Sequence, residues 1–239
     1  MPYRAALLAA LGLIACGKSP GIAGDAHGAT DGGLETPPDA GGALDAPPSS
    51  GPALPDLQFD TARMTDAWVV TNDLFLDHGD CAVIEGCVDQ SGRRTLLRFD
   101  TITANLGTAD LVMGAPPPPG VSNDVFEWSP CHMHHHVRNY ASYELLDDTG
   151  TVLTARKQSF CLEDGEQVKA GAQPHGYSCV DQGISRGWAD VYARGLPCQW
   201  IDVTDLAHGT YTLRITVNPL HVIQETDTTN NVFTTTVSF

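Results

Sequence analysis

Basic residues are scarce in this sequence: its 239 residues include 13 lysines and arginines against 29 aspartates and glutamates, a net charge of −16. An acidic surface repels phosphate, which excludes nucleic-acid binding driven by electrostatics. No apolar run reaches the roughly 18 residues that a membrane-spanning helix requires. Helical periodicity is not sustained over three turns anywhere, which argues against an α-helical fold.

The N-terminus has the pattern of an export signal. Residues 1–16 contain one arginine, then a short apolar run that ends at Cys16, which predicts a secretory signal peptide. The ending Leu13-Ile14-Ala15-Cys16 resembles the lipobox of bacterial lipoproteins, where the cysteine is acylated. Cys16 is then the expected lipid anchor and the protein's one attachment to a membrane, with plain cleavage near Ala15 as the alternative. Gly17 and Lys18, and no aspartate, stand directly after Cys16, which by the lipoprotein sorting rule favours the outer membrane or surface of a bacterium.

Two further segments follow the signal. Residues 17–54 are mostly Gly, Ala, Pro, Asp and Ser, and such a composition buries too little apolar surface to offset chain entropy. This segment is expected to be a disordered tether. Residues 55–239 have the length of one folded domain.

The domain has the patterning of a mainly β protein. Several segments alternate apolar and polar residues and are rich in β-branched and aromatic side chains. An Asp-Asp-Thr-Gly turn at 147–150 predicts a hairpin. We expect one disulfide-stapled, β-sandwich-like domain with long loops. The predicted strands are residues 95–99, 143–146, 151–153, 211–217 and 233–239.

Six cysteines lie in this domain, and their even number in an exported chain predicts three disulfides. Fifteen pairings are possible from the sequence alone. A metal-ligand role is the weaker interpretation, because the spacings contain no CxxC pair. The six are Cys81, Cys87, Cys131, Cys161, Cys179 and Cys198.

The segment Cys131-His132-Met133-His134-His135-His136 predicts a metal site. In an extended segment side chains alternate, so His132, His134 and His136 share one side. Three imidazoles suit copper, zinc, nickel or iron. The outer pair would be about 13 Å apart on an ideal strand, so a single ion requires local bending near Pro130 and Cys131. The alternative is a solvated cluster that takes up metal adventitiously.

This segment and several others resemble the lysyl oxidase family. The matching blocks keep their order across residues 55–239, and the family implies copper at His132, His134 and His136. The blocks are Leu96-Leu97-Arg98-Phe99, Gly107-Thr108-x-Asp110, Trp128-x-x-Cys131-His132-x-His134-x-His136, Ser159-Phe160-Cys161-Leu162-Glu163-Asp164, Cys198-Gln199-Trp200-Ile201-Asp202-Val203-Thr204-Asp205, Val217-Asn218-Pro219, Glu225-x-Asp227 and Thr229-Asn230-Asn231.

The resemblance implies an organic cofactor and an activity. Lysyl oxidases carry lysine tyrosylquinone, in which a lysine nitrogen is joined to an oxidised tyrosine ring. The matching residues are Lys157 and Tyr192. With copper and O₂ they imply oxidation of primary amines, including peptidyl lysine, to aldehydes with release of ammonia and hydrogen peroxide. An acidic domain attracts protonated amines, which agrees with this activity.

The resemblance also implies a calcium site that ties the first segment of the domain to the last loop. Carboxylate and amide oxygens are ligands that suit Ca²⁺. The alternative is a turn between strands stabilised by Asp and Asn side chains. The implied ligands are Asp56, Leu57 through its carbonyl, Glu225, Asp227, Asn230 and Asn231.

The chain departs from the family pattern in several places. Ser129 stands where a histidine is common, and Ser142 replaces a second family histidine, so the catalytic base stays unassigned. Two family cysteines are missing as well. If those two pair with each other in the relatives, the pairs implied here are Cys81–Cys131, Cys87–Cys198 and Cys161–Cys179.

Two other classes of function remain open at this point. A copper-binding or copper-storage lipoprotein would use the histidine cluster alone. A β-sandwich surface module would use neither metal nor quinone. Lys157 and Tyr192 favour the oxidase, because simple metal binding requires neither residue.

Overall fold

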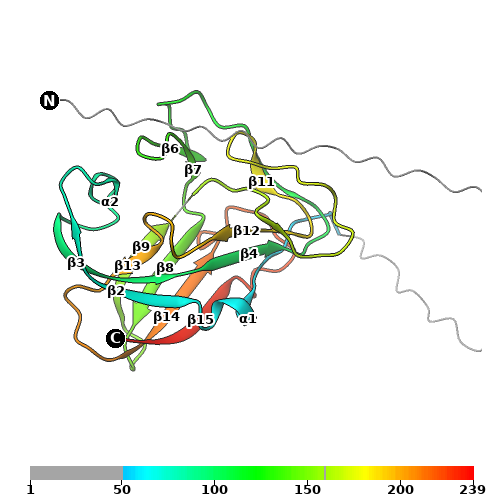
Figure 1. Ribbon diagram of the computed structural model, residues 1–239. Helices are drawn as coiled ribbons and strands as arrows, with labels where there is room; N and C mark the ends of the chain where they lie inside the picture. Colours follow the sequence, from blue (N-terminus) through cyan, green and yellow to red (C-terminus); the bar gives the residue numbers. More distant parts are fainter. Residues whose placement is uncertain (1–50, 159) are drawn as a thin grey trace, which may run out of the picture. The chain divides into compact units, whose positions relative to one another are not determined.

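The computed structural model describes residues 51–158 and 160–239, with the backbone alone for Lys157 and Gln158. The chain divides into two units, and the second, Ser50–Phe239, contains every element below (Figure 1). The predicted signal peptide, Cys16 and all but the last residues of the predicted tether lie outside the described residues.

The largest sheet is antiparallel and contains the predicted hairpin. Its strand order is β15-β14-β8-β9. Asp147 closes the turn between β8 and β9, because its Oδ1 accepts hydrogen bonds from the backbone N–H groups of Thr149 and Thr151. The strands are β8 (Ala141–Leu146), β9 (Val152–Gln158), β14 (Thr210–Val217) and β15 (Val232–Ser238).

A second four-stranded sheet has the order β1-β4-β12-β10. All five residues of β4 are buried, as expected for a central strand covered on both faces. Residues of both sheets join one hydrophobic core, which includes Tyr143 of β8 and Ala189 of β12. The strands are β1 (Leu57–Phe59), β4 (Thr101–Asn105), β10 (Glu166–Gln167) and β12 (Trp188–Tyr192).

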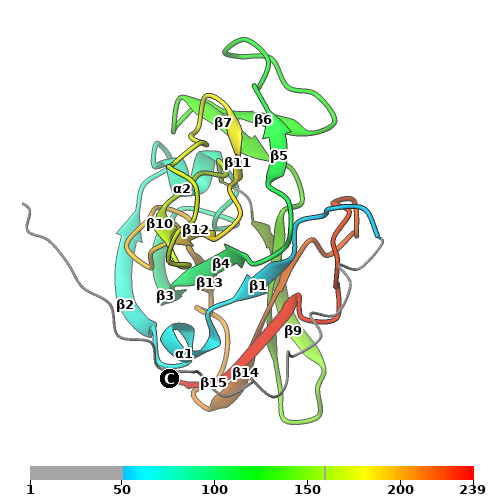
Figure 2. The same cartoon turned by 90° about the vertical axis from the view of Figure 1, so that its right-hand side faces the viewer.

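Three small sheets and two short helices complete the described part. The sheets are β13-β3-β2, β11-β5 and the hairpin β6-β7. Both views place β6, β7 and β11 at the end of the unit that lies away from the C-terminus (Figure 2). The elements are α1 (Thr61–Met64), β2 (Trp68–Leu76), α2 (Cys81–Ile84), β3 (Gly92–Phe99), β5 (Leu111–Gly114), β6 (Phe126–Ser129), β7 (His134–Val137), β11 (Gln182–Ile184) and β13 (Trp200–Asp202).

The mainly β prediction is confirmed, and each predicted strand lies within an observed one or ends within one residue of it. The six cysteines form the pairs that the family resemblance implied, with Cα–Cα separations of 5.1–5.7 Å. No helix among the described residues is long and apolar enough to cross a membrane. The pairs are Cys81–Cys131, Cys87–Cys198 and Cys161–Cys179.

Candidate metal centre

The hairpin β6-β7 brings the three histidines together. Ser129 pairs with His134 across it, and the turn between them contains His132. The turn is held at Ser129, whose carbonyl accepts from the N–H of Met133 at 2.9 Å and whose Oγ accepts from the N–H of His132 at 3.1 Å. Met133 has a φ of +58°, a left-handed conformation that reverses the chain. This turn supplies the local bending that a single ion requires.

Strand alternation separates His135 from its neighbours. His134 and His136 are two residues apart in β7, so they share one face and His135 lies on the other. His135 is buried, with Nε2 at 2.7 Å from the carbonyl oxygen of Val121 and its ring 5.0 Å from that of Trp128. The buried side chain of His135 therefore packs on the face of β7 opposite to His134 and His136.

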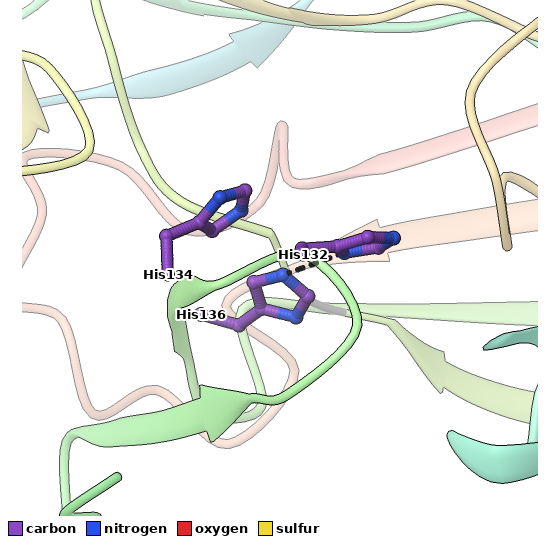
Figure 3. A group of neighbouring side chains, drawn as sticks. All are labelled: His132, His134 and His136. Atoms are coloured by element: carbon purple, nitrogen blue, oxygen red, sulfur yellow. Dashed lines mark hydrogen bonds between the residues drawn. The ribbon is translucent and has the colours of Figure 1, made fainter. Parts of the chain in front are cut away.

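The trio has the spacing of metal ligands. Its three imidazoles each offer a nitrogen within 4.8 Å of the others (Figure 3). His132 Nδ1 and His136 Nε2 are 3.2 Å apart. Metal–nitrogen bonds of about 2.0–2.1 Å separate two ligand nitrogens by roughly 3–3.5 Å. The three side chains can therefore converge on one ion with small adjustments.

The electrostatics of the trio also suit a metal. Burial and the neighbouring imidazoles lower the pKa of His136 to about 3, and burial lowers the pKa of His134. Both rings are therefore neutral at neutral pH, which is the form that ligates metal. His132 Nε2 is buried and has no hydrogen-bond partner among the described residues. The nitrogen of this ring that approaches His136 is Nδ1.

Beside the trio is a polar cavity of about 330 Å³. Glu85 lines it, accepts a hydrogen bond from the hydroxyl of Ser129, and lies 3.9 Å from His132 Nδ1. Arg156 also lines the cavity, and burial lowers its pKa to about 10. Two of the three imidazoles, those of His132 and His136, line this cavity.

Tyr192 is connected to the trio through the side chain of Phe160. Its side chain is 5% exposed, and its hydroxyl is 3.4 Å from the carbonyl oxygen of Cys161. The centroid of the Phe160 ring is 4.5 Å from the ring centroid of Tyr192, 5.6 Å from that of His136 and 6.5 Å from that of His132. The sequence did not indicate this role for Phe160.

Lys157 belongs to a different sheet from Tyr192. It lies in β9, paired with Ser142 of β8, whereas Tyr192 ends β12 and pairs with Thr101. Lys157 precedes Phe160, the ring that packs on Tyr192, by three residues. The structure thus brings the three histidines together and places Lys157 close in sequence to the residue that connects them with Tyr192.

The residues of the implied calcium site join the first strand to the last loop. Glu225 accepts from the N–H of Leu57 at 2.8 Å and from Asn231 Nδ2 at 2.7 Å. Asn230 Nδ2 donates to Asp56 at 3.0 Å. The side-chain oxygens of Asn230 and Asn231 are buried without partners among the described residues. Asp227 is used in its own turn instead, where its carboxylate accepts from the N–H and hydroxyl of Thr229.

Asp190 is a second residue that the sequence analysis missed. It is buried beside Tyr192 and lies two positions before it in β12. Strand alternation alone places these two side chains on one face. The signal was therefore present in the sequence once this segment was recognised as a strand.

Comparison with known proteins gives a family. A family model described as lysyl oxidase matches residues 55–239. Lysyl oxidase homolog 1 of Homo sapiens is 39% identical over 142 residues, 58% of this chain and 24% of the relative. Protein-lysine 6-oxidase of Rattus norvegicus is 35% identical over 164 residues, 64% of this chain and 38% of the relative.

Longer matches cover more of this chain but little of the relatives. Lysyl oxidase homolog 4 of Homo sapiens is 34% identical over 191 residues, 74% of this chain and 24% of the relative. The chain thus spans less than two fifths of the length of these three relatives. A solved CARDB domain from Pyrococcus furiosus, at 12% identity, covers 77% of this chain and 88% of its own, with a TM-score of 0.29 that is too low to bear on the fold.

Proposed function

The chain belongs to the lysyl oxidase family, and we propose that it is a copper-dependent oxidase of primary amines, including peptidyl lysine. The products are an aldehyde, ammonia and hydrogen peroxide, and the organic cofactor is a quinone formed from Lys157 and Tyr192. The observation that carries the proposal is the contact of Phe160 with Tyr192 and with two histidines of the trio, His132 and His136.

The residues of the trio fit copper. Two of the three imidazoles are kept neutral by burial, and each of the three offers a nitrogen within 4.8 Å of the others. Neutral imidazole is a ligand that copper binds well. When bound, copper supplies the redox chemistry with O₂ that converts a phenol into a quinone.

The protein residues around Tyr192 exclude water and hold its ring. The ring contacts Phe160 and, edge-on at 6.4 Å, Tyr140. Burial raises the pKa of the Tyr192 phenol well above its ordinary value, with Asp190 as the next cause. The phenol therefore stays protonated until a base in contact with it takes the proton. Lys157 supplies the amine that joins the ring, and Lys169 is the other lysine of the domain.

The cavity beside the trio supports an amine substrate. Glu85 and Glu127 line it together with Trp128. Carboxylates attract a protonated amine, and an indole face adds a cation–π contact. The net charge of the whole chain is −16, which attracts cations and raises the rate at which they encounter the protein.

Copper binding without catalysis is the second candidate. This function needs neither Tyr192 nor Lys157, because the three ligand nitrogens come from the histidines alone. Peroxide release with a simple primary amine as substrate separates the two functions. We expect activity in the copper-loaded protein and none in Tyr192→Phe or Lys157→Arg, each with copper still bound. Full activity in both variants would remove the quinone from the proposal.

Two further roles belong to this proposal. Calcium at Asp56, Leu57, Glu225, Asp227, Asn230 and Asn231 is supported by the two buried amide oxygens that lack partners within the described residues. Export followed by lipid attachment at Cys16 is supported by the signal-like residues 1–16 and by three disulfides, which form in oxidising compartments. These features suggest an amine oxidase held at the outer membrane or surface of a bacterium.

A further inference from the structure

Glu85 is a carboxylate that lies next to the histidine trio. It follows the last residue of α2, and its side chain is 14% exposed. Its Oε2 is 3.9 Å from His132 Nδ1, the nitrogen that approaches His136 Nε2 at 3.2 Å. An ion bound to that nitrogen through a bond of about 2.0–2.1 Å lies no more than about 6 Å from the carboxylate oxygen. The structure thus places one negative charge close to the ion that the trio binds.

The position of this carboxylate is fixed from two sides. Its other oxygen, Oε1, accepts a hydrogen bond from the hydroxyl of Ser129, and the same hydroxyl oxygen accepts from the N–H of His132 at 3.1 Å. The disulfide Cys81–Cys131 joins the first residue of α2 to the residue before His132. The carboxylate and the histidine turn are therefore held together before any ion binds.

The second carboxylate of the cavity is placed differently. The side chain of Glu127 is 56% exposed and forms an ion pair with Arg138 at 3.3 Å. Water and the neighbouring cation therefore screen its charge. The less exposed Glu85 lies where the effective dielectric constant is lower and charges interact more strongly. Arg156 lines the same cavity and adds a positive charge that opposes cation binding, so the negative charge of Glu85 has a cation to counter even before copper binds.

The oxidation state of copper decides how strongly this carboxylate attracts it. Imidazole ligates metal in its neutral form, so the trio adds no charge of its own. Cu(II) then brings two positive charges into the site, and Cu(I) brings one. Coulomb energy at a fixed distance is proportional to the charge of the ion. The carboxylate therefore stabilises bound Cu(II) about twice as much as bound Cu(I).

We propose that the Glu85 carboxylate compensates the charge of the copper ion and sets the preference of the trio for Cu(II) over Cu(I). This role rests on the proposed function, because it requires copper at the three histidines. Among the described residues, the group of mutually close ligand atoms at the trio contains three imidazoles and no carboxylate. Glu85 therefore acts as a charge outside the ligand set, where neighbouring groups tune the affinity and potential of a metal. The consequence is a lower Cu(II)/Cu(I) potential, which keeps the resting ion divalent in air.

The test measures the affinities of metal-free protein for Cu(II) and for Cu(I), each by competition with a chelator of known affinity. Both titrations exclude oxygen, so no quinone forms, and a reductant that leaves disulfides intact maintains Cu(I). Glu85→Gln removes the charge but keeps the length of the side chain and an oxygen that accepts from Ser129. Glu85→Asp keeps the charge.

Two further variants are matched controls. Ser129→Ala removes the hydrogen bonds to Glu85 and to the N–H of His132 and leaves every charge in place. It therefore reports the effect of turn geometry alone. Glu127→Gln removes the exposed carboxylate of the same cavity, and it reports the effect of a charge that water screens.

We expect Glu85→Gln to bind Cu(II) about 100-fold more weakly and Cu(I) about tenfold more weakly, because the lost attraction scales with the charge of the ion. The difference of about tenfold equals a rise of about 59 mV in the one-electron potential. Ser129→Ala is expected to weaken both ions by the same factor. Glu127→Gln is expected to stay within about twofold of wild type for both ions, and Glu85→Asp to recover most of the Cu(II) affinity.

The outcomes separate the two levels of the argument. Equal losses for the two ions in Glu85→Gln, or no loss for either, would overturn the inference and leave the proposed function standing. Copper affinity in wild type no higher than in His136→Ala would overturn the proposed function and the inference with it. A loss in Glu85→Gln that is larger for Cu(II) than for Cu(I), with Ser129→Ala losing both equally, supports the inference. Absence of quinone after air is then admitted to wild type would overturn the proposed oxidase alone.

Discussion

The ring centroids of Phe160 and Tyr192 lie 4.5 Å apart, and the centroids of Phe160 and His136 lie 5.6 Å apart. The tyrosine assigned to the quinone and the histidines assigned to copper therefore meet at one shared phenyl ring. Replacing that ring by a smaller apolar side chain gives Tyr192 room to move toward the imidazoles. We therefore expect Phe160 to control how closely Tyr192 approaches the histidines.

Phe160→Leu is therefore expected to form quinone faster than wild type and to be less stable by about 1 kcal/mol, because it removes part of a buried apolar side chain. Chemical denaturation measures the loss, and absorbance after copper addition measures the rate. Val237→Ala, which removes buried apolar volume in β15 away from the site, controls for a general loss of packing. Slower quinone formation in Phe160→Leu than in wild type would show that the Phe160 ring holds Tyr192 in place. It would contradict the idea that this ring blocks the movement of Tyr192 toward the histidines.

The histidine hairpin makes a prediction about copper affinity. His136→Ala removes a ligand and is expected to weaken copper binding by more than about 100-fold, which is the upper end for residues that only orient ligands. His135→Ala is the matched control, because His135 is a buried neighbour on the opposite face of β7. It is expected to lower stability and to keep copper affinity. Competition titration with a chelator of known affinity measures both, and equal losses in the two variants would contradict the assignment.

The metal-free protein is expected to lose stability in acid through His136. Its pKa is lowered to about 3 in the folded state, whereas imidazole in an unfolded chain titrates near 6.5. Between these values the unfolded chain binds a proton that the folded chain lacks. Stability therefore falls as the pH falls through this window, by up to about 1.4 kcal/mol per pH unit from this residue.

Denaturant unfolding of metal-free protein at several pH values between 7 and 4 measures this dependence. His136→Gln removes the titrating group, so its stability is expected to fall less steeply over the same range. Identical slopes in the two proteins would show that His136 takes up its proton without unfolding.

The calcium assignment predicts a stabilisation by Ca²⁺ that depends on Glu225. At a free Ca²⁺ concentration of 100 times the dissociation constant, binding to the folded state adds about 2.7 kcal/mol. Glu225→Gln is expected to lose most of this gain. Asp227→Asn is expected to lose less, because the Asp227 carboxylate is held in its own turn by Thr229. Calorimetric unfolding with Ca²⁺ or with a chelator gives the difference, and no shift in wild type would contradict the site.

Parts of this picture could be read from the sequence and others could not. The strand at 210–217 and the turn at Asp147 follow from local alternation and turn chemistry, which need no tertiary contact. The face shared by His134 and His136 follows from the same rule. The place of His132 does not, because it depends on a turn with Met133 at positive φ.

Local sequence patterns do not predict contacts between residues that lie far apart in the chain. Phe160 joins Tyr192 to the trio only because Phe160, which follows β9, packs with residues of β12 in one core. Glu85 reaches His132 through the short helix that Cys81–Cys131 fixes to the hairpin. The family resemblance implied that disulfide, but its consequence for the cavity needed the folded chain.

The most direct test of the central claim is peptide mass spectrometry of the protein after copper loading in air. The account predicts a covalent link between Lys157 and Tyr192, with the mass of the oxidised quinone, that is absent from His136→Ala and from protein kept under anaerobic conditions. Unlinked Lys157 and Tyr192 peptides in fully copper-loaded, air-exposed wild-type protein would contradict it.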